Sequence, residues 1–337
     1  MPRVTYTELL HALVEALLRL GFEPARAELG ARLFADTSRD GVHSHGVNRF
    51  PRFVRMIQSG RIDIAATPVR VGARGCLEWW DGRRGPGNLN AHASMERAIA
   101  MAREGGIGCV ALANTNHWMR GGSYGWQAAE AGMMGVCWTN TLANLPPWGA
   151  SEPLLGNNPL VVAVPRAGGH VVLDMAMSQF SYGALQAYRE RGEPLPVPGG
   201  FDEQGRLTRD AAAIEKTQRT LPIGYWKGSG LALVLDLAAG LLSGGQFTRM
   251  IERDPEKETG LSQVFVAIDA SSTGTAAATG VDQVIEEIAA RTAAKGEHVR
   301  YPGQQVLKTR EQSMRNGIPV SDATWEQIRG VGGGERQ

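Results

Sequence analysis

The first 60 residues carry apolar side chains at the spacing of amphipathic α-helices. Thr5 followed by Glu8 is typical of a capping box, in which each side chain bonds the backbone N–H of the other residue at a helix start. Pro24 suits the first turn of a second helix, which is expected to end near Arg39, and a third helix is expected over 51–59. The pattern therefore predicts a helical N-terminal segment.

From about residue 69 the apolar pattern takes the period of two that strands require, and strands then alternate with helices. A hairpin is predicted with its turn at 167–169, and 192–228, rich in Pro, Gly and charge, is expected to be a loop before a buried helix. This order predicts an α/β protein whose sheet domain is flanked by a helical layer from both termini. The expected strands lie within 69–82, 107–117, 135–141, 158–176 and 263–269, and the other helices at 90–104, 122–131, from 281, at 307–316 and at 321–330.

The balance of charge narrows the classes of partner. Lys and Arg number 35 against 34 Asp and Glu, which argues against binding to nucleic acid or to a membrane surface. The longest apolar run, 231–242, contains Asp236 and is too short to span a bilayer of ~30 Å. The first residues, MPRVTYTELLHAL, lack the basic-then-apolar layout expected of a secretory signal. The cysteines lie far apart in apolar surroundings, typical of buried thiols in a reducing compartment, so a cytoplasmic protein is expected. They are Cys76, Cys109 and Cys137.

The usual glycine-rich dinucleotide fingerprint is not found. The sequence GIGCVA at 106–111 fits G-x-G-x-x-A superficially, but that motif requires a strand before it and a helix after it. The expected order here is the reverse, so Gly106 and Gly108 are interpreted as a helix end and the turn into a strand. If a dinucleotide binds, it does not use a standard Rossmann turn.

Two imidazoles and a guanidinium crowd the connection DGVHSHGVNRFPRF at 40–53. Metal ligation by His43 and His45 would need further ligands, and only Asp40 lies nearby. A histidine with a pKa near 6.5 can transfer a proton at neutral pH, and Arg49 offers a planar fork that matches a carboxylate. A turn whose side chains bond only the backbone is the third interpretation. The residue types favour acid–base chemistry next to an anion site.

Two later stretches place polar residues where open α/β sheets bind ligands. Within 113–130, Gly121 and Gly122 precede a helix and leave backbone N–H groups free for an anion, although a turn stabilised by Asn side chains is the plain alternative. Asp174 ends an apolar strand and needs a partner there, and Lys227 begins a helix, where a nearby anion would offset its charge. These features indicate a cleft that handles a small acid. The polar residues of the first stretch are Asn114, Asn116, His117, Arg120, Ser123 and Tyr124.

Six segments together resemble the malate/L-lactate dehydrogenase family of the second type, which does not have the Rossmann fold of other lactate dehydrogenases. They are SHGVNRFPRF, NTNHWMRGGSYGWQAAEAG, CWTNT, PPWGA, NNPL and GYWKGSGLALVLD, and the similarity runs from Thr5 to Trp325. The family consists of nicotinamide-dependent reductases of 2-oxo acids. The variants NHWMRGGSYGWQ and NRFPRF are similar to the branch that reduces the sugar acid 2,3-diketo-L-gulonate. The resemblance implies a homodimer with a mixed-sheet cofactor domain.

The resemblance also implies roles for individual residues. His45 is expected to be the general acid that protonates the carbonyl oxygen, with Asp174 as its charge partner. Arg49 is expected to bind the substrate carboxylate, with Ser44 and His117 touching the substrate. NADH is the expected cofactor, with NADPH as the alternative, and no metal is expected. The implied cofactor-binding residues are His170, Val171, Val172, Leu173, Asp174, Met175, Ala176, Trp226, Lys227, Gly303, Gln304 and Gln305.

One departure and several alternatives accompany this assignment. Gln305 stands where the family usually has a glutamate, which changes the contact expected with the ribose or adenine. The substrate could instead be another 2-oxo acid or a cyclic imino acid. Outside this class, a metal-dependent hydrolase using His43 and His45, or a non-catalytic sugar-acid-binding protein, would also use the cleft. The expected domains are helical, 1–65 with 305–337, and mixed α/β for cofactor and substrate, 66–304.

Overall fold

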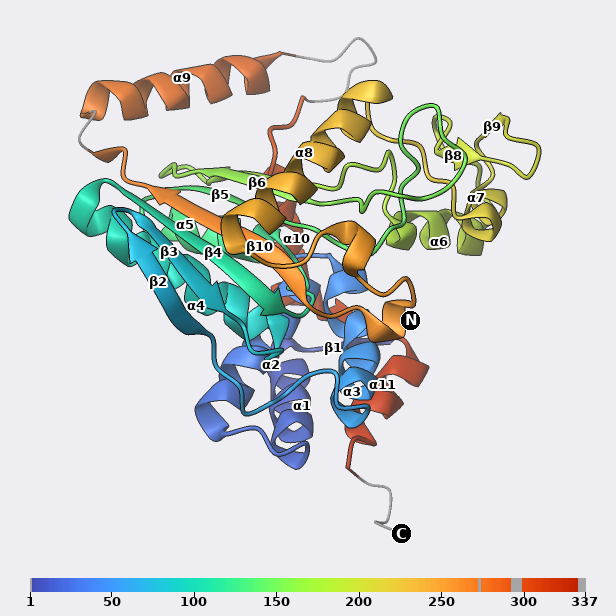
Figure 1. Ribbon diagram of the computed structural model, residues 1–337, viewed down its shortest axis with the longest axis horizontal. Helices are drawn as coiled ribbons and strands as arrows, with labels where there is room; N and C mark the ends of the chain where they lie inside the picture. The colour runs from blue at the N-terminus through green and yellow to red at the C-terminus, as the bar shows by residue number, and fades with distance from the viewer. Residues whose placement is uncertain (1, 272–273, 292–298, 333–337) are drawn as a thin grey trace.

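A mixed β-sheet lies at the centre of the molecule, with helices on both faces and a helical layer at one end (Figure 1). The computed structural model describes residues 2–271, 274–291 and 299–332. Strands β3 and β4 run parallel, and the other neighbouring pairs of this sheet run antiparallel. In spatial order the strands are β2 (Val69–Arg74), β3 (Leu77–Asp81), β4 (Ile107–Thr115), β10 (Leu261–Ile268), β5 (Met134–Thr139), β6 (Leu160–Val164) and β7 (Val171–Met175).

The helices and small elements surround this sheet. The longer helices are α1 (Tyr6–Arg19), α2 (Pro24–Arg39), α3 (Phe50–Gln58), α4 (Gly87–Gly105), α5 (Gly122–Glu130), α6 (Tyr182–Arg191), α7 (Ala211–Thr217), α8 (Trp226–Ser243), α9 (Thr275–Ala290), α10 (Gln304–Asn316) and α11 (Asp322–Arg329). The short elements include 3₁₀ turns η1 (His43–His45), η2 (Val47–Arg49), η3 (Thr248–Met250) and η4 (Pro255–Lys257), and strand pairs β1 (Arg3–Val4) with β11 (Ile318–Pro319) and β8 (Gly200–Phe201) with β9 (Leu207–Thr208).

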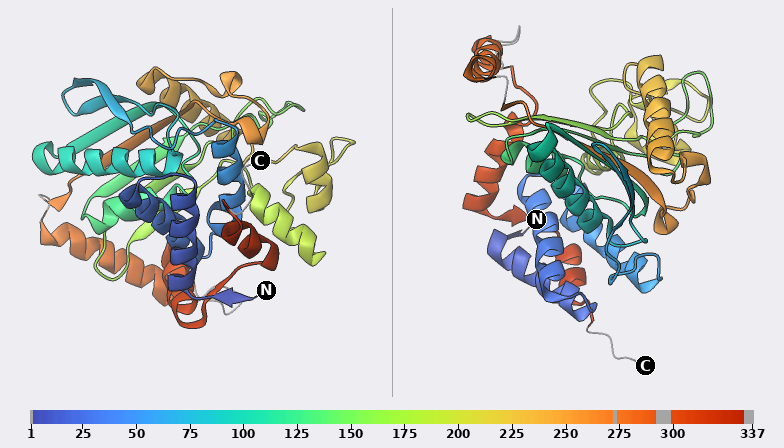
Figure 2. Two further views of the ribbon diagram at one scale, coloured as in Figure 1. Left: turned by 90° about the horizontal axis from the view of Figure 1, so that it is seen from below. Right: turned by 60° about the vertical axis from the view of Figure 1, so that its left-hand side comes forward.

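Both ends of the chain build the helical layer, as the sequence pattern predicts. The capping box is confirmed: Thr5 Oγ1 accepts from Glu8 N at 3.2 Å, and Glu8 Oε2 accepts from Thr5 N at 2.8 Å. The apolar faces of α1, α2 and α3 share one hydrophobic core with Ile318 and Ile328 from the C-terminal end. Pairing of β1 with β11 joins the two ends, and Figure 2 shows this layer at one side of the sheet.

Helices cover the two faces of the sheet differently. Helices α4 and α5 pack on one face over a core that includes Val110, Cys137 and Phe265. Helix α8 lies on the opposite face, against β10, β4 and β5 (Figure 1). The turn between β4 and α5 reaches the helical layer, because Arg120 Nη1 in this turn donates to Asp40 Oδ2 at 2.7 Å. This turn and η1 are the two segments that bring polar side chains together.

The mixed α/β architecture with helices from both termini is confirmed, and several local expectations are wrong. The stretch 192–228 is not only loop, because it contains α7 and the β8–β9 pair. Helix α6 precedes it and was not expected; its short length and mixed charge give a weak periodic signal. Helix α9 begins at Thr275 instead of 281, and α10 at Gln304 instead of 307. Gly106 ends α4 in the left-handed conformation, φ +81°, as the helix-end interpretation predicts.

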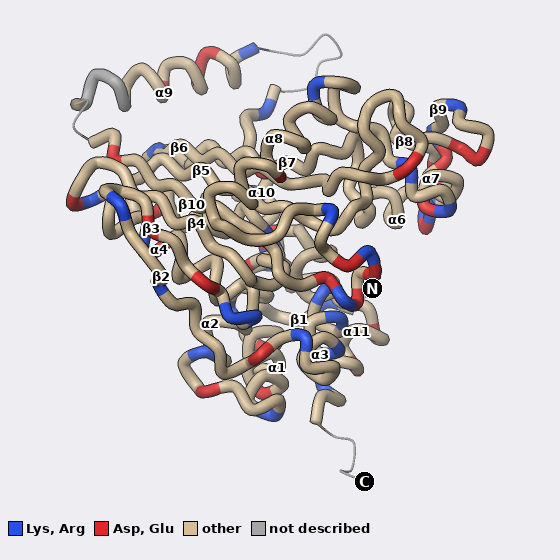
Figure 3. The backbone as a smooth tube through the Cα atoms, viewed as in Figure 1, with Lys and Arg blue, Asp and Glu red and all other residues tan. Residues whose placement is uncertain are grey.

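Two expectations about burial also change. Helix α8 is expected to be buried, but one of its faces is exposed in the described chain. Cys137 is buried as expected, whereas Cys109 is half-buried and Cys76 is exposed in the turn after β2; the three are free thiols. Basic and acidic positions are interspersed along the chain (Figure 3). Within the described residues, no helix combines the length and apolarity that crossing a bilayer requires.

Candidate active site

A cavity of about 620 Å³ is bounded by the helical layer, the turn after β4 and the last strand of the sheet. The turn η1 contributes Ser44 and His45, and the turn after β4 contributes His117 and Arg120. The opposite wall comes from β7 and from the segment before α10. Further lining residues are Trp126, Thr141, Asn157, Val172, Leu173, Asp174, Ala176, Ser181, Arg300, Tyr301, Pro302 and Gly303.

His45 lies at the end of η1, where the backbone is held close to α2. A Cβ at Gly46 would lie 2.3 Å from Ser38 Oγ, so only glycine lets the turn approach the helix this closely. His45 Nδ1 is 2.9 Å from Ser44 Oγ, and its ring stacks on that of His117 with the centroids 5.8 Å apart. Burial, with the positive charges of Arg49 and Arg120, lowers the pKa of His45 to about 4. The imidazole is therefore neutral at pH 7 in the free protein.

His117 is held in one orientation by its own turn. The backbone N–H of Met119 donates to Nδ1 at 3.0 Å, so the neutral ring carries its proton on Nε2. Met119 adopts φ +65°, a left-handed conformation that L-residues rarely take, and this closes the turn. Burial, reinforced by the charge of Arg49, holds the pKa of His117 well below its usual range. His117 can donate a hydrogen bond to a substrate oxygen without being charged.

Arg49 ends the turn η2, which follows η1, and it does not line the cavity. Its side chain is 18% exposed, and its Nη2 is 3.7 Å from Glu258 Oε2. The Glu258 carboxylate is fixed by the backbone N–H of Leu142, which donates to Oε1 at 3.1 Å. Burial and the neighbouring Arg52 lower the pKa of Arg49 to about 10, which leaves it charged at neutral pH. Its charge acts on both His45 and His117.

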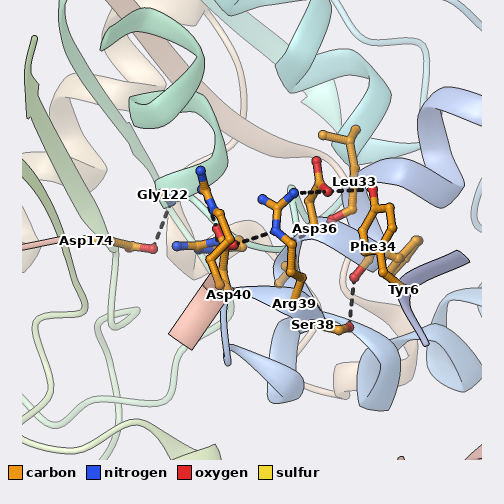
Figure 4. A network of polar contacts seen from close by, with 12 residues as sticks. Tyr6, Leu33, Phe34, Asp36, Ser38, Arg39, Asp40, Gly122 and Asp174 are labelled. Atoms are coloured by element: carbon orange, nitrogen blue, oxygen red, sulfur yellow. Dashed lines mark hydrogen bonds and ion pairs between the residues drawn. The ribbon is translucent and has the colours of Figure 1, made fainter. Parts of the chain in front are cut away.

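Asp174 reaches the same cavity from the end of β7, but it does not bond His45. Its Oδ2 accepts from the backbone N–H of Gly122 at 2.8 Å, at the start of α5 (Figure 4). Burial raises the pKa of this carboxyl, while the charge of Arg120 and the Gly122 hydrogen bond oppose the rise. In the described part of the chain, no hydrogen bond or ion pair joins Asp174 to His45. The expected pairing is therefore not a direct contact here.

The residues expected to bind the cofactor divide into two groups. Two segments meet at the cavity wall because Val172 N donates to Pro302 O at 3.0 Å, and Gly303 adopts φ +94° there. The expected residues that line the cavity are Val172, Leu173, Asp174, Ala176 and Gly303. Those that do not are His170, Val171, Met175, Trp226, Lys227, Gln304 and Gln305.

Two of the segments outside the lining are tied by hydrogen bonds to residues next to it or in it. Ile223, just before α8, donates from its backbone N to Met177 O at 2.8 Å, and this brings Trp226 and Lys227 toward the end of β7 as exposed side chains. Gln305 is exposed and accepts from Arg300 Nη1 at 2.8 Å. The neutral amide thus bonds a cation that itself lines the cavity.

Sequence reasoning noted Arg120 but did not assign it to the site. Its position in a cavity wall depends on Asp40, 80 residues earlier, which receives its Nη1 at 2.7 Å. A buried arginine so far along the chain from its carboxylate has no local signal. His43, by contrast, lies outside the cavity lining. Among the described residues, no group of three or more His, Cys, Asp or Glu lies close enough together to hold a metal ion.

This fold and site define a class of enzyme, the dehydrogenases that act on 2-hydroxy and 2-oxo acids. The model of the Malate/L-lactate dehydrogenase family matches residues 4–329, and the chain belongs to this family. A dehydrogenase of this family implies a nicotinamide cofactor. The family membership also decides against the hydrolase and the non-catalytic binding protein.

Curated relatives and solved structures agree with this assignment. Proteins named 2,3-diketo-L-gulonate reductase from Klebsiella pneumoniae and Citrobacter koseri are 46% and 45% identical, over 98% of this chain and 100% of each relative. A sulfolactate dehydrogenase from Methanocaldococcus jannaschii is 25% identical with a TM-score of 0.91, covering 98% of this chain and 96% of its own. A delta1-piperideine-2-carboxylate reductase from Pseudomonas syringae is 28% identical with a TM-score of 0.87, covering 98% and 100%.

Proposed function

We propose that this enzyme reduces the 2-oxo group of 2,3-diketo-L-gulonate to give 3-keto-L-gulonate, with NADH as the reductant and NADPH as the alternative. The observation that carries the proposal is the identity of 45% to proteins named for this reaction, over the full length of both chains. The cavity supports it, because His45 and His117 present imidazoles beside a positive field from Arg49 and Arg120. Such a field suits an acid substrate.

The chain's own residues supply acid–base and binding chemistry. Reduction of a ketone leaves a negative oxygen, and His45 delivers a proton to it while Arg49 holds the carboxylate. Ser44 Oγ, 2.9 Å from His45 Nδ1, fixes the ring, and His117 donates to a substrate oxygen through Nε2. Asp174 acts as the charge partner of His45 across the cavity, not through contact. When bound, the nicotinamide supplies the hydride.

The residues present fit a nicotinamide cofactor. A Cβ at Gly303 would lie 3.1 Å from His170 O and from Val172 N, so glycine lets this segment lie close against the backbone of β7 where the two form the cavity wall. Two buried polar atoms close to the wall, Trp126 Nε1 and Gln304 Oε1, have no partner among the described residues. A donor and an acceptor of this kind match the polar groups of a dinucleotide. The segment 300–303 and the strand β7 would hold it.

The proposal is tested by following the absorbance of NADH and of NADPH with purified enzyme and a set of acids. The set contains 2,3-diketo-L-gulonate, pyruvate, oxaloacetate and the cyclic imine Δ1-piperideine-2-carboxylate. We expect the diketo acid to give the highest kcat/KM. Faster turnover of the cyclic imine would favour the imino-acid alternative, to which the similarity to the Pseudomonas syringae structure points. Faster turnover of pyruvate or oxaloacetate would favour a simple 2-oxo acid.

The depressed pKa of His45 gives a pH prediction with a definite sign. Proton delivery needs the charged ring, which the free enzyme holds only near and below its pKa of about 4. A bound carboxylate offsets the positive field of Arg49 and raises this pKa. We expect kcat/KM for reduction to fall about tenfold per pH unit across neutral pH, whereas kcat keeps its plateau to higher pH. Initial rates over the range in which the enzyme stays folded measure both profiles, and identical apparent pKa values in them would contradict the prediction.

We propose that the enzyme is a cytoplasmic homodimer and that α8 forms part of the interface. Leu233, Leu237 and Leu241 form an exposed stripe on the face of α8 that points away from the sheet, and Leu241 is 79% exposed. An apolar stripe of this kind is unfavourable in water unless another surface covers it. The family resemblance makes a second copy of the chain the expected cover.

Leu237→Asp should convert the dimer to a monomer, because it places a charge in the centre of the apolar stripe. Size-exclusion chromatography with light scattering gives the mass directly. Val71→Asp is the matched control, since Val71 is 66% exposed on β2, an edge strand of the sheet. A Leu237→Asp protein that keeps the mass of the wild type would contradict the assignment of α8 to the interface.

A further inference from the structure

Arg120 is a buried cation in the cavity wall that contributes to the positive field of the site but to which the proposed reaction assigns no contact with the substrate. It lies in the turn between β4 and α5 and is 5% exposed. Its Nη1 donates to Asp40 Oδ2 at 2.7 Å, and its Nε is buried without a partner among the described residues. It lines the cavity together with His45, and a Cβ at Gly122 would lie 3.2 Å from its Nε. The same Cβ would lie 2.8 Å from Asp174 Oδ2, so glycine at 122 lets the Arg120 guanidinium and the Asp174 carboxyl approach each other at the cavity wall.

Asp40 fixes the position of Arg120 from the helical layer. The Asp40 carboxylate also receives Arg39 Nε at 2.9 Å (Figure 4). It further receives both Nε and Nη2 of Arg310 at 2.9 Å. Burial opposes the charge of Asp40, but the Arg310 hydrogen bonds and the charges of Arg120 and Arg39 outweigh it and lower the pKa to about 2. Asp40 is therefore a permanent anion. The side chain of Arg120 is held by a charged hydrogen bond that binding of substrate need not break.

The three guanidiniums of the cluster differ in their carboxylate partners. Arg39 Nη1 also donates to Asp36 Oδ1 at 2.8 Å, and Arg310 lies in the field of Glu130 and Asp36, whereas the one carboxylate hydrogen-bonded to Arg120 among the described residues is Asp40. Asp174 is the carboxyl on the cavity side, where burial raises its pKa while the charge of Arg120 and the Gly122 hydrogen bond oppose the rise. A buried guanidinium with an unused N–H donor costs free energy. An electron-rich oxygen in the cavity would remove this cost by accepting a hydrogen bond from Arg120.

We propose that Arg120 is a specificity-determining residue that binds the 3-oxo oxygen of the substrate, and that Asp40 is the positioning residue that holds it. The inference rests on the proposed function and extends it. A 2,3-diketo acid presents two adjacent carbonyl oxygens, and His45 and His117 serve the one that is reduced. A guanidinium N–H in the same wall serves the neighbouring oxygen. Pyruvate and other simple 2-oxo acids lack that oxygen, so Arg120 discriminates against them by leaving its own donor unpaired.

The test compares two substrates in the wild type and in Arg120→Lys and Arg120→Gln. We expect kcat/KM for 2,3-diketo-L-gulonate to fall about ten- to a hundredfold, the range for a hydrogen bond from a charged donor. For a simple 2-oxo acid the fall should stay within about threefold, because that substrate never used the contact. Equal losses for both substrates would overturn the proposal and make Arg120 a carboxylate contact.

A second measurement does not depend on turnover of the simple acid. Inhibition by oxalate, which has carboxylates but no 3-oxo group, should be unchanged in the Arg120 variants, and NADH binding measured by tryptophan fluorescence should also be unchanged. Asp40→Asn should reproduce the substrate-selective loss in weaker form. A loss of oxalate inhibition equal to the loss of kcat/KM would overturn the proposal.

Arg39→Gln is the matched control. Arg39 bonds the same Asp40 carboxylate but does not line the cavity, so this variant removes a guanidinium from the cluster and leaves the donor in the wall. We expect Arg39→Gln to keep the wild-type ratio of kcat/KM for the two substrates. A ratio altered as much as in the Arg120 variants would show that the effect comes from the stability of the cluster, and this would overturn the proposal. If the wild type does not reduce the diketo acid, the proposed function fails; if only the selectivity of the Arg120 variants is missing, this inference fails alone.

Discussion

His45→Ala is expected to lower kcat for reduction by about 10²–10⁴-fold, the contribution that one positioned acid usually makes. The structure places this imidazole in the cavity, next to Ser44 and stacked on His117. Without the ring, the proton must come from water, which is a much weaker acid than an imidazolium. Steady-state rates at saturating NADH and diketo acid measure the change.

His43→Ala is the matched control for this experiment. His43 is two residues away in the same turn, its Nδ1 has no partner among the described residues, and it does not line the cavity. Its removal should change kcat less than about threefold, because only His45 is positioned to act as the acid. NADH binding, followed by tryptophan fluorescence, should be retained in both variants. A larger loss in His43→Ala than in His45→Ala would contradict the assignment of the acid.

The site turns could be located from the sequence because their signals are local. The capping box at Thr5 and Glu8, Pro24 at the start of α2 and the glycines around 41–46 all act within a few residues. They fix where the second helix ends and therefore where His45 lies. The main strands were equally visible, since their alternation continues over several residues in each case.

The contacts that tune the site could not be predicted in the same way. Asp40 and Arg120 are 80 residues apart, and Arg310 is another 190 residues along the chain, so only the tertiary fold brings them together. The same limit applies to Asp174, whose hydrogen-bond donor is the backbone of Gly122 and not His45. Residue type indicated that each charge needed a partner, but not which partner it would find.

The apolar face of α8 shows a different limit. The run LALVLDLAAGLL predicts a helix that avoids water, and the helix is present, but the composition does not say what covers it. In a single chain, one face packs on the sheet and the other is exposed. Hydrophobicity therefore predicted α8 and its tendency to avoid water. The surface that covers the outer face of α8 belongs to the quaternary structure, which the pattern of a single chain does not describe.

Arg49→Lys is expected to raise KM for the acid substrate about ten- to a hundredfold and to lower kcat as well. Lysine keeps the positive charge but loses the planar fork that binds a carboxylate through two parallel hydrogen bonds. The substrate is then held less firmly, so its carbonyl is less often placed for reaction at His45. The separate measurement of KM and kcat is informative, because a change of stability alone would not raise KM.

Arg52→Lys is the matched control, since Arg52 lies one turn further along and pairs at 3.2 Å with Glu256 near the surface. The kinetics of Arg52→Lys should stay close to those of the wild type.

Arg49 pairs only loosely, at 3.7 Å, with Glu258, so the Arg49 guanidinium is available to turn toward a substrate anion. Unchanged KM in Arg49→Lys would move the carboxylate contact elsewhere. Arg120 would then be the cation left to take it, because Arg120 already lines the cavity beside His45. The two arginine variants, measured with the same pair of substrates, therefore decide which guanidinium binds the acid end and which binds the second carbonyl.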